Sequence, residues 1–202
     1  MLIGWVSPSP SRPLANSAPA SAADGTRTDE LTRAEVALRR QVKALVAHLR
    51  ASCPGFEKAY LMTTATGVQV RETRRIIGIY TLTKEDVVSG TRFPDAVVVS
   101  GFPADLHSPD GKGMETHITK THQVPYRCLV PKEVDGLLVA GRCVSATREA
   151  LAAIRQTAPA MAMGQAAGTA AALSVLTQNA PRRLSVELLR SELIKAKVIL
   201  ES

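Results

Sequence analysis

The sequence is short of the residues that build small metal centres and disulfide frameworks. Its three cysteines, Cys53, Cys128 and Cys143, are odd in number and widely spaced, and none forms a Cys-x-x-Cys pair. Neither a zinc site nor an iron–sulfur cluster can be assembled from such a set within this chain. The histidines match no common ligand spacing either. We therefore expect no metal site, and three reduced, mostly buried thiols in a cytoplasmic protein.

Aromatic residues are also scarce, at 3% of the chain. The net charge of +7 favours an anionic partner, such as a dinucleotide, a nucleic acid or a membrane surface. Because no basic cluster is interleaved with aromatic residues, nucleic acid is the weakest of these. A glycine-rich dinucleotide fingerprint is missing too. Gly111-Lys112-Gly113 lacks the third glycine, and no apolar run or helix signal follows it.

Charge is absent from one long segment, Gln156 to Pro181, whose length could cross a membrane. The segment is mostly alanine and glycine with interspersed polar residues, so a buried helix packed on a sheet is the better interpretation. We expect no membrane span. Met1 to Val6 is short, has no basic region and runs into prolines, so we expect no signal peptide either.

The most informative stretch, Gly136 to Leu176, contains three elements in succession. Four apolar residues at 137–140, bounded by glycines, predict a strand buried on both faces. After Gly141-Arg142 a short helix begins, with Thr147 as its N-cap, and Thr157-Ala158-Pro159 opens a longer helix. Elsewhere the pattern predicts helices over about 29–51, 83–90 and 186–195, and strands within 60–83, 96–100 and 124–131.

The longer helix has small residues at every fourth position, which form one ridge: Ala160, Gly164, Gly168 and Ala172. A glycine inside a helix costs about 1 kcal/mol relative to alanine. We therefore expect a neighbouring element or a ligand to approach the ridge closely. The start of the helix, expected around Ala160 to Met163, has free backbone N–H groups that suit an electron-rich ligand.

These motifs resemble the C-terminal flavin-binding segment of the FAD-dependent oxidoreductases related to the A subunit of heterodisulfide reductase. The resemblance lies in LLVAGRCVSATREALAAIR and MAMGQAAGTAAAL, and upstream, in the family's order, in VRETRRIIGIYTLTKEDV, FPDAVVVSGFPADLHSPDG and VPYRCLVPKEVDGLLVAGR. It implies an α/β fold: the C-terminal part of a Rossmann-like FAD/NAD(P)-binding flavoprotein, with a mixed α+β substrate-side region. Relatives often carry a [4Fe–4S] cluster on cysteines that this sequence lacks.

The resemblance also implies a site. Gly141 and Arg142 would lie near the ribitol and pyrophosphate of FAD. Five residues at the start of the longer helix would turn their N–H groups to the flavin pyrimidine edge: Met161, Ala162, Met163, Gly164 and Gln165. For chemistry near the ring we favour Arg155, which precedes that helix, as a charge stabiliser or substrate anchor. Arg127 and Tyr126 are weaker candidates, and a salt bridge or a satisfied phenol is the structural alternative for all three.

The expected organisation has three regions. Residues 1–28 should be disordered because they are rich in Ser, Pro and Ala. Residues 29–130 should form the α+β substrate-side region, and residues 131–202 the closing strand and helices of the FAD-binding domain. Proteins of the resembled family begin with a strand, Gly-x-Gly-x-x-Gly and helix unit that holds the ADP half of FAD. A truncated reading frame, and one half of a split enzyme completed by a second chain, are both open interpretations.

The implied function is oxidation or reduction by hydride or electron transfer through FAD, with an unidentified small molecule or redox protein as substrate. This sequence departs from the family's usual pattern at two positions. Arg148 stands where a histidine is common, and Ala160 where a cysteine is common, which leaves the substrate open. The alternative function is a non-catalytic basic module that binds an anionic partner with steep salt dependence.

Overall fold

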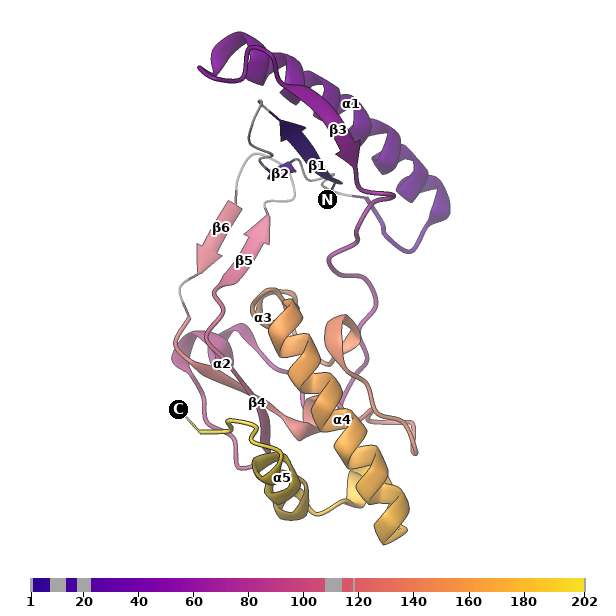
Figure 1. The fold of residues 1–202 in the computed structure, drawn as a ribbon. Coiled ribbons are helices and arrows are strands. Elements are labelled where there is room, and N and C mark those ends of the chain that lie inside the picture. The colour runs from indigo at the N-terminus through magenta and orange to yellow at the C-terminus, as the bar shows by residue number, and fades with distance from the viewer. Residues whose placement is uncertain (1, 8–13, 18–22, 108–113, 118, 202) are drawn as a thin grey trace. The chain divides into compact units, whose positions relative to one another are not determined.

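The computed structural model describes residues 2–7, 14–17, 23–107, 114–117 and 119–201 (Figure 1). Contacts within the chain define two units. The first contains Met1–Thr73 with His107–Gly113, and the second contains Arg74–Leu106 with Met114–Ser202. The chain therefore passes from one unit to the other after residue 73, whereas the sequence suggested a boundary near residue 130.

The first unit is one long helix and a three-stranded antiparallel sheet. The helix α1 (Thr28–Ser52) confirms the predicted helix over 29–51, and Cys53 is its C-cap. The strands lie in the order β2-β1-β3, with bounds β1 (Leu2–Ser7), β2 (Leu14–Ser17) and β3 (Tyr60–Thr64). Leu38 and Val42 are buried on the inner face of α1 and pack against Ala65 and Val68.

Residues 1–28 were expected to be disordered, but two segments within them form the strands β1 and β2. β1 pairs with both β2 and β3, so its backbone groups are hydrogen-bonded on either side. Composition cannot reveal this, because the partner β3 lies more than fifty residues further along the chain. Residues 8–13 and 18–22, which are part of the same prediction, lie outside the described residues.

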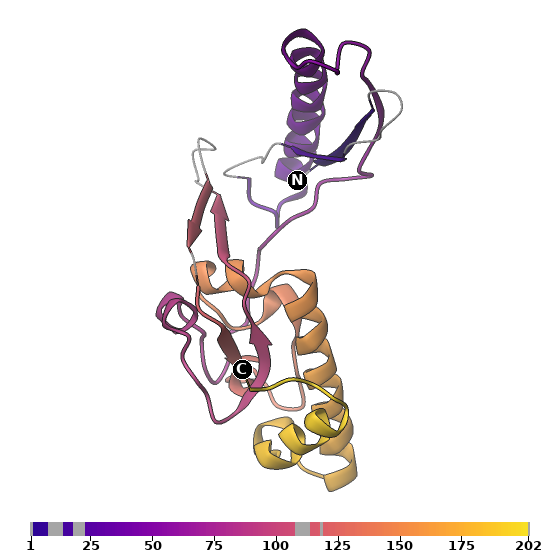
Figure 2. The same cartoon turned by 60° about the vertical axis from the view of Figure 1, so that its left-hand side comes forward.

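The second unit packs helices against a short antiparallel pair of strands. The pair is β4 (Ala96–Ser100) with β7 (His122–Pro125), and β5 (Ala104–His107) lies beside β6 (Met114–His117). The helices are α2 (Lys84–Ser89), α3 (Arg148–Ile154), α4 (Thr157–Thr177) and α5 (Val186–Lys195), with 3-10 turns η1 (Tyr126–Cys128), η2 (Gly141–Cys143) and η3 (Pro181–Arg183). Figure 2 shows α4 and α5 side by side, and both contact β4.

Local signals place several of these elements as predicted. Thr83 caps α2 through a capping box with Asp86, and Gly90 ends it in the left-handed conformation, with φ of +73°. Thr147 accepts a hydrogen bond from the Ala150 N–H at the start of α3. The predicted strand 96–100 and helix 186–195 are confirmed with the same bounds. On α5, Leu189 and Leu193 are buried and Leu188 is half-buried.

The predicted strand at 137–140 is wrong. These residues belong to no strand, although Ala140 has extended backbone angles, and Leu137 is 44% exposed. The Val139 N–H donates to the Leu129 carbonyl at 2.9 Å, and Leu138 and Ala140 are partly buried against the core. A strand buried on both faces needs strands beside it and layers over it, and no described strand pairs with this segment. The predicted strand 124–131 is also shorter, because η1 follows β7 directly.

The expectation that α4 is buried is also wrong. Only Pro159, Met163, Ala166 and Ala170 are buried, on one face. The ridge of small residues lies outside that face, and a Cβ added at Gly164 or Gly168 would meet nothing within 4 Å among the described residues. By length and composition α4 could cross a membrane, and 22% of its apolar window is buried. The described fold is therefore mixed α/β, with a largely exposed, uncharged helix.

Candidate functional site

The candidate site is built from η2 and α4, which contact each other in the second unit. Gly141 begins η2 with φ of +81°, a conformation that favours glycine. Apart from its two chain neighbours, none of the described residues has an atom within 4 Å of the position where its Cβ would be. Arg142 follows it and is exposed. Backbone and a cationic side chain are therefore accessible next to the uncharged helix.

As the sequence suggested, Thr157-Ala158-Pro159 opens α4, but the N–H groups without a helical partner lie before the expected range Ala160 to Met163. The helix begins at Thr157, and the Ala160 N–H already donates to the Gln156 carbonyl at 3.0 Å. Because Pro159 has no N–H, the backbone donors left without a helical partner are those of Thr157 and Ala158. The N–H groups of Met161 to Gln165 lie within the hydrogen-bonded turns of the helix. Their contact with flavin stays a prediction.

The side chains of those five residues differ in access. Met161 is 70% exposed, and Gly164 and Gln165 are exposed as well. Met163 is fully buried in the core, and Ala162 is half-buried. Any ligand on this face would thus meet Met161, Gly164 and Gln165, while Met163 fixes the helix to the fold.

Arg155 lies at the junction of the two helices. It is the C-cap of α3, and its N–H donates to the Leu151 carbonyl at 2.9 Å. The residue is half-buried, and it interacts with another group of the chain. Only Gln156 separates it from the first turn of α4, so Arg155 and the helix start are neighbours in the chain.

Arg127 and Tyr126 are held in η1 by contacts within the fold. Arg127 forms a fork with Asp95, with Nε 2.9 Å from Oδ2 and Nη2 3.1 Å from Oδ1, and its guanidinium lies 5.1 Å from the centre of the Tyr80 ring. The Tyr126 hydroxyl donates to the Pro181 carbonyl at 3.0 Å, and burial raises its pKa to about 12. These contacts are the salt bridge and the satisfied phenol that the sequence left open as structural alternatives. The catalytic roles of Arg127 and Tyr126 stay predictions.

The surroundings of η1 are poor in groups that titrate near neutral pH. Burial, and then a hydrogen bond to Asp86, raise the pKa of Tyr80 to about 12. Burial also raises the pKa of the Cys128 thiol to about 12. Both groups are therefore protonated at neutral pH, and the Tyr80 hydroxyl is tied to α2 through Asp86.

Sequence patterns gave no sign of the structural role of Arg182. The Arg182 Nη2 donates to the carbonyls of Pro131 and Lys132, each at 3.1 Å, and of Val134 at 3.4 Å. Its Nε is ion-paired with Asp135. Arg182 therefore fixes the loop at residues 131–135, which precedes the segment 137–140. No local motif marks it, because its partners lie about fifty residues earlier.

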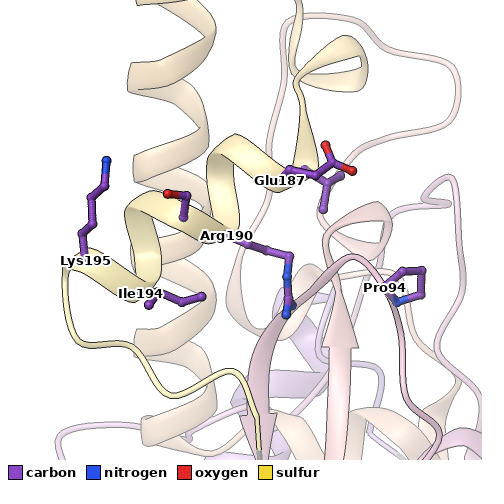
Figure 3. A pocket seen from close by; sticks show the side chains of 7 residues that line it. Pro94, Glu187, Arg190, Ile194 and Lys195 are labelled. Atoms are coloured by element: carbon purple, nitrogen blue, oxygen red, sulfur yellow. The ribbon is translucent and has the colours of Figure 1, made fainter.

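A shallow groove of about 420 Å³ runs along α5 (Figure 3). Its lining combines apolar and charged side chains: Pro94, Val186, Glu187, Arg190, Ser191, Ile194 and Lys195. Arg190 donates to the Ala96 carbonyl and lies 3.9 Å from Glu201. Its guanidinium thus ties α5 to the start of β4.

The fold and the surface formed by η2 and α4 define a class: a mixed α/β protein with an exposed, uncharged helix beside an accessible Gly-Arg turn. The family model for FAD dependent oxidoreductases matches residues 7–193, and the chain belongs to this family. Family membership implies FAD as cofactor. No curated protein and no solved structure matches the chain. Among the described residues, no cluster of His, Cys, Asp and Glu could hold a metal ion.

Proposed function

We propose that this chain forms the flavin side of the FAD site of an oxidoreductase, and that a glycine-rich unit on another segment or chain forms the ADP side. The observation that carries the proposal is the exposed, uncharged face of α4 beside η2. Met161 is 70% exposed on it, and Gly164 has open space where a side chain would be. A helix that has no charged residue and little burial requires a cover, and a flat apolar ring system is a suitable one.

The residues of this surface suit particular parts of FAD. Gly164 and Gly168 let a ring approach the backbone of α4 without displacing a side chain. The N–H groups of Thr157 and Ala158 lie at the positive end of the helix dipole, which stabilises negative charge. Arg142 is exposed next to α4 and suits a phosphate or a ribitol hydroxyl. Bound flavin would supply the hydride or electron transfer.

The other half of a dinucleotide site is not represented in this sequence. The sequence contains no Gly-x-Gly-x-x-Gly turn, the motif that normally places the pyrophosphate at a helix N-terminus. The segment 137–140 is consistent with a shared site, because it has the apolar residues of a buried strand but no described strand beside it. A unit that adds strands there would complete both the sheet and the cofactor site.

Within the family, the order of the sequence motifs supports a relation to the A subunit of heterodisulfide reductase. We propose Arg155 as the charge stabiliser or substrate anchor, because it is half-buried immediately before α4. The substrate would be a small molecule or a redox protein, and the site of action the cytoplasm.

Flavin retention tests the proposal. Losing the contacts to the ADP half should reduce affinity by several orders of magnitude, since each 1.4 kcal/mol is about tenfold. The chain alone should purify colourless and leave micromolar FAD free in equilibrium dialysis. Adding the glycine-rich unit, fused or as a second chain, should restore visible flavin absorbance. Arg142→Ala should then weaken retention, while Arg183→Ala, on an exposed residue of η3, should not.

Two outcomes would contradict the proposal, and they are distinct. A chain that purifies yellow with stoichiometric flavin would show that the site is not shared. A completed protein that stays colourless would remove the flavin assignment for this chain.

A further inference from the structure

We infer that the outward face of α1 is a docking surface for an acidic protein. The face consists of Val36, Arg40, Lys43, Ala47 and Arg50, which recur at alternating steps of four and three and therefore share one side of the helix. All five are exposed. The opposite side of α1 contains Ala34, Leu38 and Val42, which are buried in the first unit.

The described residues do not neutralise the charge of this face. From Val36 to the end of α1 at Ser52 the helix has four basic residues and no acidic one. The acidic residues of α1 lie in its first half, where Asp29 pairs with Arg33 and Glu35 with Arg39. Arg40 and Lys43 have no hydrogen-bond or ion-pair partner among the described residues.

The simplest alternative is a solvated face that stabilises the helix. It accounts for Arg50, because a cation near a helix C-terminus is favourable and its Nε donates to the Glu57 carbonyl at 3.4 Å. It does not account for Arg40 and Lys43. They lie in the middle of the helix, with no acidic residue one turn away to pair with.

The chemistry of the face selects among anionic partners. A membrane would require α1 to insert apolar side chains, but Leu38 and Val42 are 0% and 3% exposed inside the fold. On DNA, three cations would make at most three phosphate contacts. The salt slope would then be only about −2.7, typical of weak, sequence-independent binding.

A folded acidic partner makes fuller use of the face. Val36, at 46% exposed, and Ala47 lie among the cations, so a protein surface could bury them while its carboxylates meet Arg40 and Lys43. The charges would speed association, and the apolar contact would slow dissociation. This inference does not depend on flavin binding.

The test compares three probes on the full chain at physiological ionic strength, about 0.15 M. They are a synthetic helical peptide with glutamates and leucines on one face, vesicles containing phosphatidylserine, and a DNA duplex. The peptide should bind more tightly than either of the others. Arg40→Glu combined with Lys43→Glu should weaken peptide binding at least tenfold.

A matched control separates the face from overall charge. Lys132→Glu combined with Arg183→Glu makes the same change in net charge on exposed residues of the second unit, and should leave peptide affinity within about twofold. The milder pair Arg40→Gln and Lys43→Gln, which keeps good helix formers, should give an intermediate loss if the reversed pair does not fold. Equal losses in the α1 and control variants, no peptide binding at this ionic strength, or tighter binding of vesicles or DNA would each overturn the inference.

Discussion

At the scale of single residues, Gly78 marks a close approach of chain segments in the second unit. It forms an isolated antiparallel bridge with Pro131, and a Cβ added there would lie 2.7 Å from the Ser145 Cβ. The carbonyl oxygens of Tyr80 and Arg127 would be 3.0 and 3.1 Å away. Two of these three neighbours are backbone atoms, which cannot move aside as a side chain can. Gly78 therefore allows three chain segments to meet.

We expect Gly78→Ala to destabilise the protein by about 1–3 kcal/mol, because the methyl group would overpack this junction. Urea unfolding followed by circular dichroism measures the change. Gly168→Ala is the control, since its added Cβ meets open space and alanine is favoured over glycine in a helix by up to about 1 kcal/mol. Indistinguishable midpoints for the two variants would contradict the close approach at Gly78.

At the scale of elements, the sequence predicts best what is determined locally. The capping box of Thr83 with Asp86 and the left-handed Gly90 are sufficient to bound α2, and the leucine spacing is sufficient for α5. Thr147 and Pro159 likewise mark the starts of α3 and α4. Each of these signals acts within one or two turns, so no knowledge of the rest of the chain is required.

Elements that depend on distant partners could not be predicted in the same way. The apolar run at 137–140 has the composition of a buried strand, but no described strand lies beside it. The small residues of α4 suggested that a neighbouring element or a ligand comes close, and among the described residues Gly164 has no such neighbour. The same limit applies to the site, because Arg127 and Tyr126 look available in sequence until Asp95 and Pro181 are placed against them.

The strand β7 contains a buried histidine that should make stability depend on pH. His122 is 0% exposed, its Nδ1 lies 3.0 Å from the Lys120 carbonyl, and its Nε2 has no hydrogen-bond partner among the described residues. Burial lowers the pKa of His122 below its ordinary value of 6.5. At a pH between the folded and unfolded pKa values, the unfolded chain binds more protons, so protonation favours unfolding.

We therefore expect the contribution of His122 to be fully present above about pH 6.5 and to be lost as the pH falls below it. The free energy of unfolding, measured in urea at a series of pH values, should decline less steeply in His122→Leu, which cannot titrate. Carboxylates affect both proteins alike, so the difference between the two curves isolates the histidine. Parallel curves would mean that His122 has the same pKa in the folded and unfolded states.

At the scale of the whole molecule, two surfaces of opposite character are left without cover among the described residues. In the second unit, α4 exposes an uncharged face that includes Met161, Val175 and Leu176, the last two 78% and 79% exposed. In the first unit, α1 exposes a basic face. Large exposed apolar patches often mark binding sites, which supports the proposal that flavin covers this face of α4.

Gly164→Leu distinguishes a covered face from an idle one, because it has opposite consequences in the two cases. In the chain alone an added Cβ meets none of the described residues within 4 Å, so we expect stability to be unchanged or to rise by up to about 1 kcal/mol. In the protein completed by a glycine-rich unit, the same side chain should block the approach of the flavin and lower FAD retention, measured by absorbance after gel filtration. Ala171→Leu lies on the same face about 10 Å further along the helix, and should retain FAD if the ring binds near the start of α4. Destabilisation of the chain alone by Gly164→Leu would reveal a close neighbour that the described residues lack, and normal FAD retention in the completed protein would exclude Gly164 from the flavin site.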